Sequence, residues 1–200
     1  LSSTGIDLSG PSKGEQACGD NGYGRMSEPE EIYETIMLTR SKPLDGKKII
    51  ITAGPTREQI DPVRFISNNS SGKMGFAMAE AAVRSGAEVI LIAGPVSLSC
   101  SHQIHRVDVQ TADEMYREAR SFMPDTDIFI GCAAVADFKV GNKSKNKIKK
   151  NDNLNIKLER NIDILNYVSN HNSMRPKLVI GFAAETDNLE KNANIKLSNK

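Results

Sequence analysis

The 200-residue sequence lacks tryptophan and contains only three cysteines, Cys18, Cys100 and Cys132. An odd number of widely spaced cysteines fits neither a disulfide framework nor the paired ligand spacing of a zinc site. We therefore expect free thiols in a reducing compartment. The sequence also lacks an apolar run of the roughly 18 residues that a membrane span requires. Residues 1–20 lack the basic-then-apolar pattern of a signal peptide, so we expect a cytoplasmic protein with no membrane partner.

An excess of charge of one sign is missing as well. Lys and Arg together number 26 against 25 Asp and Glu, which gives a formal net charge of +1. A net charge this close to zero provides no global field that would steer nucleic acid to the chain, so charge must be considered locally. The chain is 38% hydrophobic and 26% charged, which is typical of a globular protein. Its length allows one domain, or one domain plus part of another.

The first residues differ in composition from the rest of the chain. Six of the fifteen glycines fall within residues 1–24, before any strand or helix pattern begins. Taken alone, this stretch favours a linker in which Cys18 is incidental. A short helix is predicted over 30–38, with Ser27 and Glu30 in the register of a capping box. Residues 41–46 then have the composition of a linker, so we place a domain boundary near residue 45.

Beyond that boundary, apolar strand patterns alternate with helical ones. Strands are predicted at 48–53, 88–93, 127–134, 154–158 and 177–183, and helices at 71–85, 111–122, 162–169 and 189–200. This alternation predicts an α/β fold with a Rossmann-like, mostly parallel sheet and flanking helices. Ligands of such folds bind beyond the carboxyl ends of the strands, so we expect the binding residues in the loops that follow the strands.

The loop after the first strand runs from residue 54 to residue 72 and leads into a helix. A helix N-terminus presents free backbone N–H groups and favours an anion. The residues at this start are Ser70, Ser71, Gly72 and Lys73. The loop contains neither a Walker A motif nor G-x-G-x-x-G, and its pattern leaves a phosphate site and a simple helix cap as equal alternatives. The three cations Arg57, Arg64 and Lys73 favour the phosphate site.

The loop after the third strand combines small residues with one carboxylate. Residues 131–136 would let a flat ring approach the backbone, and Asp137 can accept a hydrogen bond from an exocyclic amine or cap a helix. Cys132 is more typical of an inert buried thiol than of a nucleophile. Residues 139–150 contain six lysines and predict an exposed, flexible loop. Such a loop could also bind nucleic acid, although it has no aromatic residue to stack a base, or close over a triphosphate, with Lys147 the most anchored lysine.

Six motifs, taken in order, resemble the phosphopantothenate–cysteine ligase half of the bacterial bifunctional proteins of coenzyme A biosynthesis. They are ITAGPTR at 51–57, DPVR at 61–64, ISNNSSGKMG at 66–75, GCAAVAD at 131–137, KIKK at 147–150 and GFAAET at 181–186. Upstream, residues 17–29 resemble the end of the flavin-dependent phosphopantothenoylcysteine decarboxylase half. The resemblance implies that residues 1–44 are the loop-plus-helix tail of the decarboxylase domain and a linker. Residues 45–200 would then be a ligase domain that is incomplete at its C-terminus.

The resemblance implies a two-step ligation. The carboxylate of 4′-phosphopantothenate attacks CTP to give an acyl-cytidylate and pyrophosphate, and the amine of L-cysteine then displaces CMP. Mg²⁺ would accompany the triphosphate, and no metal ligand is assigned. The adjoining decarboxylase would act on the product with FMN, whose binding core would lie upstream of this chain. The resemblance further implies a homodimer or higher homo-oligomer without a nucleic-acid partner.

The resemblance also assigns residues to the site. Nucleotide contacts would come from Gly131, Cys132, Ala133, Asp137, Lys147, Ile162, Asp163, Ile164, Leu165, Phe182, Lys196 and Lys200. Ile162 departs from the proline that is usual at its position. Asn68 would act in turnover of the acyl-cytidylate, and Arg64 would bind the phosphate or carboxylate of the substrate. Cys18 would protonate the enethiol intermediate of the decarboxylase.

Two other functions compete with the ligase. A non-catalytic nucleotide- or RNA-binding module could use residues 139–150, the lysine-rich segment, and its RNA affinity would depend steeply on salt. A dinucleotide-dependent oxidoreductase is the second rival, but the absence of G-x-G-x-x-G argues against it.

Overall fold

The computed structural model describes residues 8–15, 19–40, 42–150, 155–183, 187, 188 and 194. The chain divides into two compact units, residues 1–43 and 44–200. The division lies near residue 45, whereas the assignment of the first unit to a decarboxylase stays a prediction.

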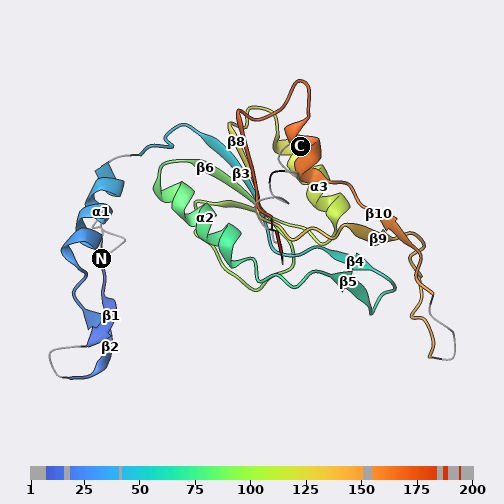
Figure 1. The fold of residues 1–200 in the computed structure, drawn as a ribbon, viewed down its shortest axis with the longest axis horizontal. Helices are drawn as coiled ribbons and strands as arrows, with labels where there is room; N and C mark the ends of the chain where they lie inside the picture. Colours follow the sequence, from blue (N-terminus) through green and yellow to red (C-terminus); the bar gives the residue numbers. More distant parts are fainter. Residues whose placement is uncertain are drawn as a thin grey trace. The chain divides into compact units, whose positions relative to one another are not determined.

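In the first unit, the antiparallel strands β1 (Ser12–Glu15) and β2 (Asn21–Arg25) precede helix α1 (Pro29–Arg40) (Figure 1). The predicted linker therefore forms a hairpin, and Cys18 lies outside the described residues. The predicted capping box of Ser27 and Glu30 is wrong. The Ser27 hydroxyl is buried 3.1 Å from that of Ser12, and Glu31 accepts the N–H of Glu28 at 3.2 Å instead.

The second unit contains a five-stranded parallel sheet in the order β11-β8-β3-β6-β7. Its strands are β3 (Lys48–Ala53), β6 (Glu88–Ala93), β7 (His105–Asp108), β8 (Ile128–Gly131) and β11 (Leu178–Gly181). The predicted Rossmann-like parallel sheet is confirmed, because this order places the first strand in the middle and reverses direction beside it. Of the five strands in this sheet, only β7 is not predicted from the sequence. Its residues are partly exposed on an edge strand and carry little apolar signal.

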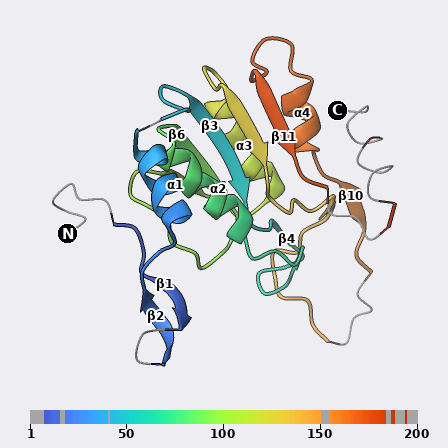
Figure 2. The same ribbon diagram turned by 60° about the vertical axis from the view of Figure 1, so that its left-hand side comes forward.

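The sheet is covered on both faces because its central strands are apolar on both faces. Ile49, Ile51 and Ala53 of β3 pack with α2 (Lys73–Arg84) on one face. Ile50 packs on the other face with α3 (Ala112–Phe122) and α4 (Ile164–Ser169) (Figure 2). Parallel strands buried in this way have continuous apolar sequences, which explains why β3 and β6 match their predicted ends.

Local sequence signals fix α3, whereas short strands escaped prediction. The Thr111 hydroxyl accepts the N–H of Glu114 at 3.2 Å, and the Glu114 carboxylate accepts that of Thr111 at 3.1 Å, as expected of a capping box. The strand predicted at 154–158 is wrong in position, because β10 (Leu158–Arg160) pairs with β9 (Phe138–Val140). The helix predicted at 189–200 lies outside the described residues except at Asn194, which is helical.

Two pairs of short antiparallel strands in the second unit, β4 (Arg57–Gln59) with β5 (Phe65–Ser67) and β9 with β10, lie outside the main sheet. Because β4 pairs with β5, the long loop after β3 is partly ordered into a hairpin. Strand β4 also packs beside β9 (Figure 1). Among the described residues, no helix is long and apolar enough to cross a membrane.

Asp127 joins three strands at the opposite end of the sheet. Its carboxylate accepts hydrogen bonds from the N–H of Lys48 at 3.2 Å and from Nζ of Lys177 at 3.0 Å. Its own backbone N–H donates to the Lys48 carbonyl at 2.9 Å. The hydrogen bond from Lys177, followed by that from Lys48, lowers the pKa of Asp127. The ionised carboxylate therefore stabilises the folded state.

We predict that Asp127→Asn lowers the thermal unfolding midpoint at pH 7, because the amide cannot replace both charge-assisted contacts. A carboxylate whose folded pKa is lowered contributes its stability above the unfolded pKa of about 3.9 and loses it as the pH falls towards the folded pKa. The difference between the two proteins should therefore shrink below about pH 4. Unfolding followed by circular dichroism between pH 2.5 and 7 measures this difference, and a difference independent of pH would contradict the assignment.

Candidate functional site

A cavity of about 610 Å³ opens where β3 and β8 end side by side. After β3 the chain continues to β6, its neighbour towards one edge of the sheet. After β8 it continues to β11, which forms the opposite edge. Loops that diverge at such a switch point leave a crevice, which is where ligands of open α/β sheets bind. The volume lies in the range typical of small-molecule sites.

The wall of the cavity is the segment 132–136, whose backbone is bonded to the end of β3 and the loop that follows it. The N–H of Cys132 donates to the Thr52 carbonyl at 3.1 Å, and that of Ala134 donates to the Gly54 carbonyl at 2.9 Å. The Thr56 hydroxyl, which is fully buried, accepts the N–H of Ala136 at 3.0 Å. These bonds satisfy the backbone of an irregular segment internally, so the wall is preorganised.

Asn68 ties the loop after β3 to the same wall. Its Nδ2 atom donates to the carbonyls of Ala134 and Val135 at 3.3 and 3.1 Å. Two carbonyl oxygens can only accept, so the orientation of the amide is set by its partners. The hydroxyl of neighbouring Ser67 donates to the Thr56 carbonyl at 2.8 Å, which adds a second tie.

The structure brings most of the predicted nucleotide residues together. The cavity is lined by Asn68, Gly131, Cys132, Ala133, Asp137, Ile162, Asp163, Ile164, Leu165 and Phe182. Arg64, Lys147 and the predicted phosphate loop Ser70, Ser71, Gly72 and Lys73 are not among its lining residues, although Met74 is. Cys18, Lys196 and Lys200 lie outside the described residues.

The polar residues of the wall differ in what they do. Asp137 is exposed just before β9, so it is not the cap of a helix. Asp163 does cap α4, because its Oδ1 atom accepts the N–H of Asn166 at 2.9 Å. Burial raises the pKa of the Cys132 thiol, whose sulfur lies 3.5 Å from that of Met78. A neutral thiol packed on a thioether agrees with the inert role expected for Cys132.

Sequence reasoning missed Asn161, which holds the wall from the other side. Its Nδ2 atom donates to the Ala136 carbonyl at 2.9 Å, and its backbone N–H donates to the Asp137 carbonyl at 2.8 Å. Its Oδ1 atom is buried and has no partner among the described residues. An asparagine that bonds a segment 25 residues away leaves no local signal, so spacing could not have identified it.

The start of α2 packs closely on the end of β3. Gly72 takes a left-handed conformation with φ of 75°, and a Cβ atom on Gly75 would lie 2.6 Å from that of Ala53. The hydroxyls of Ser70 and Ser71 accept the N–H groups of Gly72 and Lys73 at 3.3 and 3.5 Å. These two bonds span only two residues each, and the N-cap of α2 is Gly72, which has no side chain to accept an N–H group. The alternative in which Ser70 or Ser71 caps the helix is therefore wrong.

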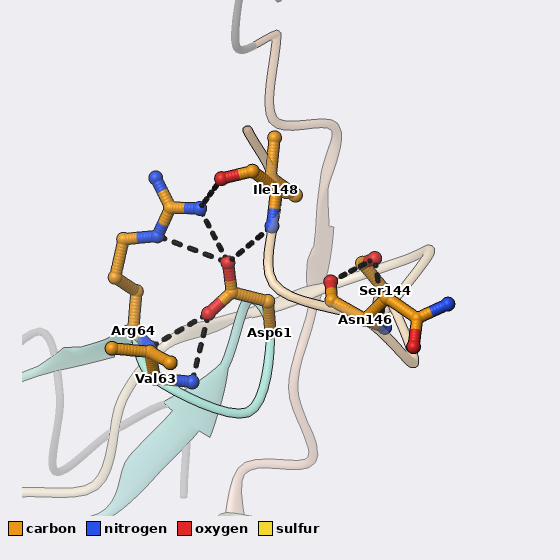
Figure 3. A network of polar contacts seen from close by, with 6 residues as sticks. All are labelled: Asp61, Val63, Arg64, Ser144, Asn146 and Ile148. Atoms are coloured by element: carbon orange, nitrogen blue, oxygen red, sulfur yellow. Dashed lines mark hydrogen bonds and ion pairs between the residues drawn. The ribbon is translucent and has the colours of Figure 1, made fainter. Parts of the chain in front are cut away.

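Arg64 is engaged within the chain. Its Nε atom donates to Oδ2 of Asp61 at 3.0 Å, and Nη2 donates to that oxygen and to the Ile148 carbonyl at 2.9 Å (Figure 3). These bonds from Arg64 hold the pKa of the buried Asp61 carboxyl well below its usual range, although burial by itself raises that pKa. Arg64 is expected to bind substrate, but two of its three guanidinium nitrogens, Nε and Nη2, hold the loop in place instead.

Comparison with known proteins agrees with this architecture. A family model described as the DNA/pantothenate metabolism flavoprotein C-terminal domain matches residues 44–200. The chain belongs to this family. The coenzyme A biosynthesis bifunctional protein CoaBC of Haemophilus influenzae is 50% identical over 203 residues, covering 100% of this chain and 50% of that protein. Escherichia coli CoaBC is 50% identical over 202 residues, covering 98% of this chain and 50% of that protein.

A solved relative carries the same fold. The crystal structure of the C-terminal domain of a CoaBC protein superposes with a TM-score of 0.69 at 45% identity, covering 80% of this chain and 75% of that one. The resemblance found from the motifs is therefore confirmed. The chain spans about half the length of the curated relatives it matches. Within the described residues, no group of three or more His, Cys, Asp or Glu side chains could hold a metal ion.

We predict that Thr56→Val destabilises the second unit by about 1–3 kcal/mol, because the buried N–H of Ala136 loses its acceptor. Thr56→Ser keeps the hydroxyl and is the matched control, with a smaller loss from the missing methyl group. Urea unfolding followed by circular dichroism gives both values. A larger loss in Thr56→Ser than in Thr56→Val would show that packing of the methyl, and not the hydrogen bond, holds the wall.

Proposed function

We propose that residues 45–200 are a phosphopantothenate–cysteine ligase domain that uses CTP, and that the chain acts in coenzyme A biosynthesis. One observation carries the proposal. Residues that the resemblance assigns to the nucleotide come from three separate parts of the chain, namely 131–137, 162–165 and Phe182, and all three line one cavity at the switch point of the sheet. The relatives at 50% identity act in coenzyme A biosynthesis by name, which supports the same assignment.

The shape and polarity of the cavity suit a nucleotide base. Small residues along 131–136 let a flat ring approach the wall, and Phe182 and Leu165 add apolar surface. Asp137 provides an exposed carboxylate that can accept from the amine of cytosine. A uracil carbonyl would face that carboxylate without a proton between them, so the site should disfavour UTP.

The acylation step requires cations around the phosphates, because a carboxylate must approach a triphosphate and pyrophosphate must leave. We assign this role to Lys147 of the lysine-rich segment, with Lys73 at the start of α2 as a second exposed cation. Mg²⁺ would enter with the triphosphate. Its ligands would be phosphate oxygens, which are of the kind Mg²⁺ prefers, because the Asp137 carboxylate would face the base and Oδ1 of Asp163 caps α4.

In the second step, the reaction of the acyl-cytidylate with cysteine, Asn68 can act through its Oδ1 atom. Its Nδ2 atom is held by two carbonyls, so Oδ1 is the end of the amide that can orient the reacting groups. A neutral amide does this without competing as a nucleophile for the mixed anhydride. Arg64 retains Nη1 for the substrate phosphate or carboxylate, since no described residue bonds that atom.

The proposal extends to the whole protein. Residues 1–44 would be the tail of a flavin-dependent decarboxylase domain, with FMN bound in the adjoining domain and Cys18 as its proton donor. Lys196 and Lys200 would complete the nucleotide contacts. We also propose a cytoplasmic homodimer or higher homo-oligomer whose partners are CTP, 4′-phosphopantothenate and L-cysteine.

The decisive experiment follows pyrophosphate release by the complete protein with 4′-phosphopantothenate and either CTP or ATP. We expect release that requires both substrates and favours CTP by at least about tenfold, as a hydrogen-bonded site allows. RNA is the alternative ligand. Salt-sensitive RNA binding that CTP does not displace, without pyrophosphate release, would favour the binding module instead.

We predict that Asn68→Asp slows the cysteine-dependent step by about a hundredfold while leaving acyl-cytidylate formation faster than its consumption. Asn68→Ala is the control, because it removes both ties to the wall without adding charge. Quenched-flow measurement separates pyrophosphate release from amide formation. If both steps fell together in Asn68→Asp, the residue would act through the wall and not through the intermediate.

A further inference from the structure

The lysine-rich segment is fastened at two points to the turn between β4 and β5. The N–H of Ser144 donates to the Ile60 carbonyl at 3.0 Å. Four residues further on, the N–H of Ile148 donates to Oδ2 of Asp61 at 3.1 Å, and the Ile148 carbonyl accepts from Arg64 (Figure 3). The segment expected to be a flexible loop is therefore bonded on both sides of Lys147.

The segment between these two points is also bonded to itself. The Ser144 hydroxyl donates to the Asn146 carbonyl at 2.6 Å and lies 3.4 Å from the N–H of Asn146 (Figure 3). Only Lys145, Asn146 and Lys147 lie between the fastened positions. A closure this short leaves the backbone few alternative conformations, so the exposed Lys147 side chain starts from a fixed Cα position.

Asp61 is the centre of this arrangement. Its Oδ1 atom accepts the N–H groups of Val63 and Arg64 at 2.8 Å each, and its Oδ2 atom accepts from Ile148 and from the guanidinium of Arg64. The side chain is fully buried, so its donors come from the protein. An asparagine would present N–H groups to the Ile148 N–H or to the turn, and either orientation loses acceptors.

We propose that Asp61 is a positioning residue for the nucleotide step: it fastens the peptide of Ile148 to the β4–β5 turn and so fixes Lys147 relative to Asn68. Asn68 lines the cavity and belongs to the same loop as Asp61. Asp61 itself is not among the residues that line the cavity, so we assign it no contact with the substrate. The inference rests on the proposed function, because Lys147 matters only if a triphosphate is bound.

A double-mutant cycle tests whether Asp61 acts through Lys147. It compares kcat/KM for CTP in pyrophosphate release by the complete protein and its variants Asp61→Asn, Lys147→Gln and the double variant. We expect each single change to lower kcat/KM about tenfold and the double variant to be no worse than Lys147→Gln, since the two residues would act as one unit. Asp108→Asn removes an exposed carboxylate paired with Arg106 and should leave kcat/KM unchanged.

Each outcome of the cycle decides something different. Additive losses would show that Asp61 does not act through Lys147 but through its other partner Arg64 or through general stability, and the positioning role would be overturned while the ligase function stands. Unchanged kinetics in Asp61→Asn would overturn it as well. Unchanged kinetics in Lys147→Gln would remove Lys147 from the proposed site, and the inference would fall with it.

Hydrogen exchange supplies a measurement that does not depend on activity. In the unmodified protein, the Ile148 amide should exchange more slowly than the amides of Lys145 and Lys149, because a buried carboxylate holds it. Asp61→Asn should remove that protection while the amides of β3 stay protected. Fast exchange of Ile148 in the unmodified protein would overturn the proposal even if the variant failed to fold.

Discussion

The bonding of the segment after β8 to the chain after β3 is the constraint on which the site depends. Parallel strands end at the same edge of a sheet, and here their connections leave in opposite directions, so the backbone of 132–136 would otherwise be exposed in a crevice. Thr52, Gly54 and Thr56 accept its N–H groups, and Asn68 donates to its carbonyls. The wall is therefore rigid without belonging to a strand. A rigid wall of small residues is what allows a flat ligand to be recognised by a few polar groups.

The parts of the fold that the sequence could predict are those whose cause is local. Strand β3 is apolar throughout because both of its faces are buried, and Thr111 and Glu114 cap α3 from within one turn. The three-residue strands β4, β5, β9 and β10 form because they pair with one another, and three residues show no period. Ser27 has the composition of a helix cap, yet its hydroxyl faces Ser12, a contact that only the hairpin creates.

The same distinction applies to the site. The wall residues that line the cavity, including Gly131 and Asp137, lie within one motif, so a motif could indicate them. Asn161 lies in none of the motifs and could not be found in this way, since it acts by bonding the backbone of a distant segment. Thr56 lies within the motif at 51–57, but its bond to Ala136, 80 positions away, leaves no local signal. Asp61 makes one set of bonds that the local sequence could indicate and one bond that it could not. Its bonds to Val63 and Arg64 follow the local sequence, whereas its bond to Ile148 spans 87 positions.

Counting charges along the loop after β3 overstates what it offers to an anion. Arg57 lies over the ring of Phe65 at 4.7 Å, and Arg64 is paired with Asp61. The acidic residues of the loop, Glu58 and Asp61, are buried. Glu58 accepts the N–H of Ala112 at the start of α3 at 2.9 Å. Most charges of the loop therefore hold the hairpin in place, and Lys73 is the cation among these that remains exposed. Under the proposed function, the positive potential that a triphosphate needs would come largely from the lysine-rich segment, so the position of that segment would bear on the chemistry as well as on folding.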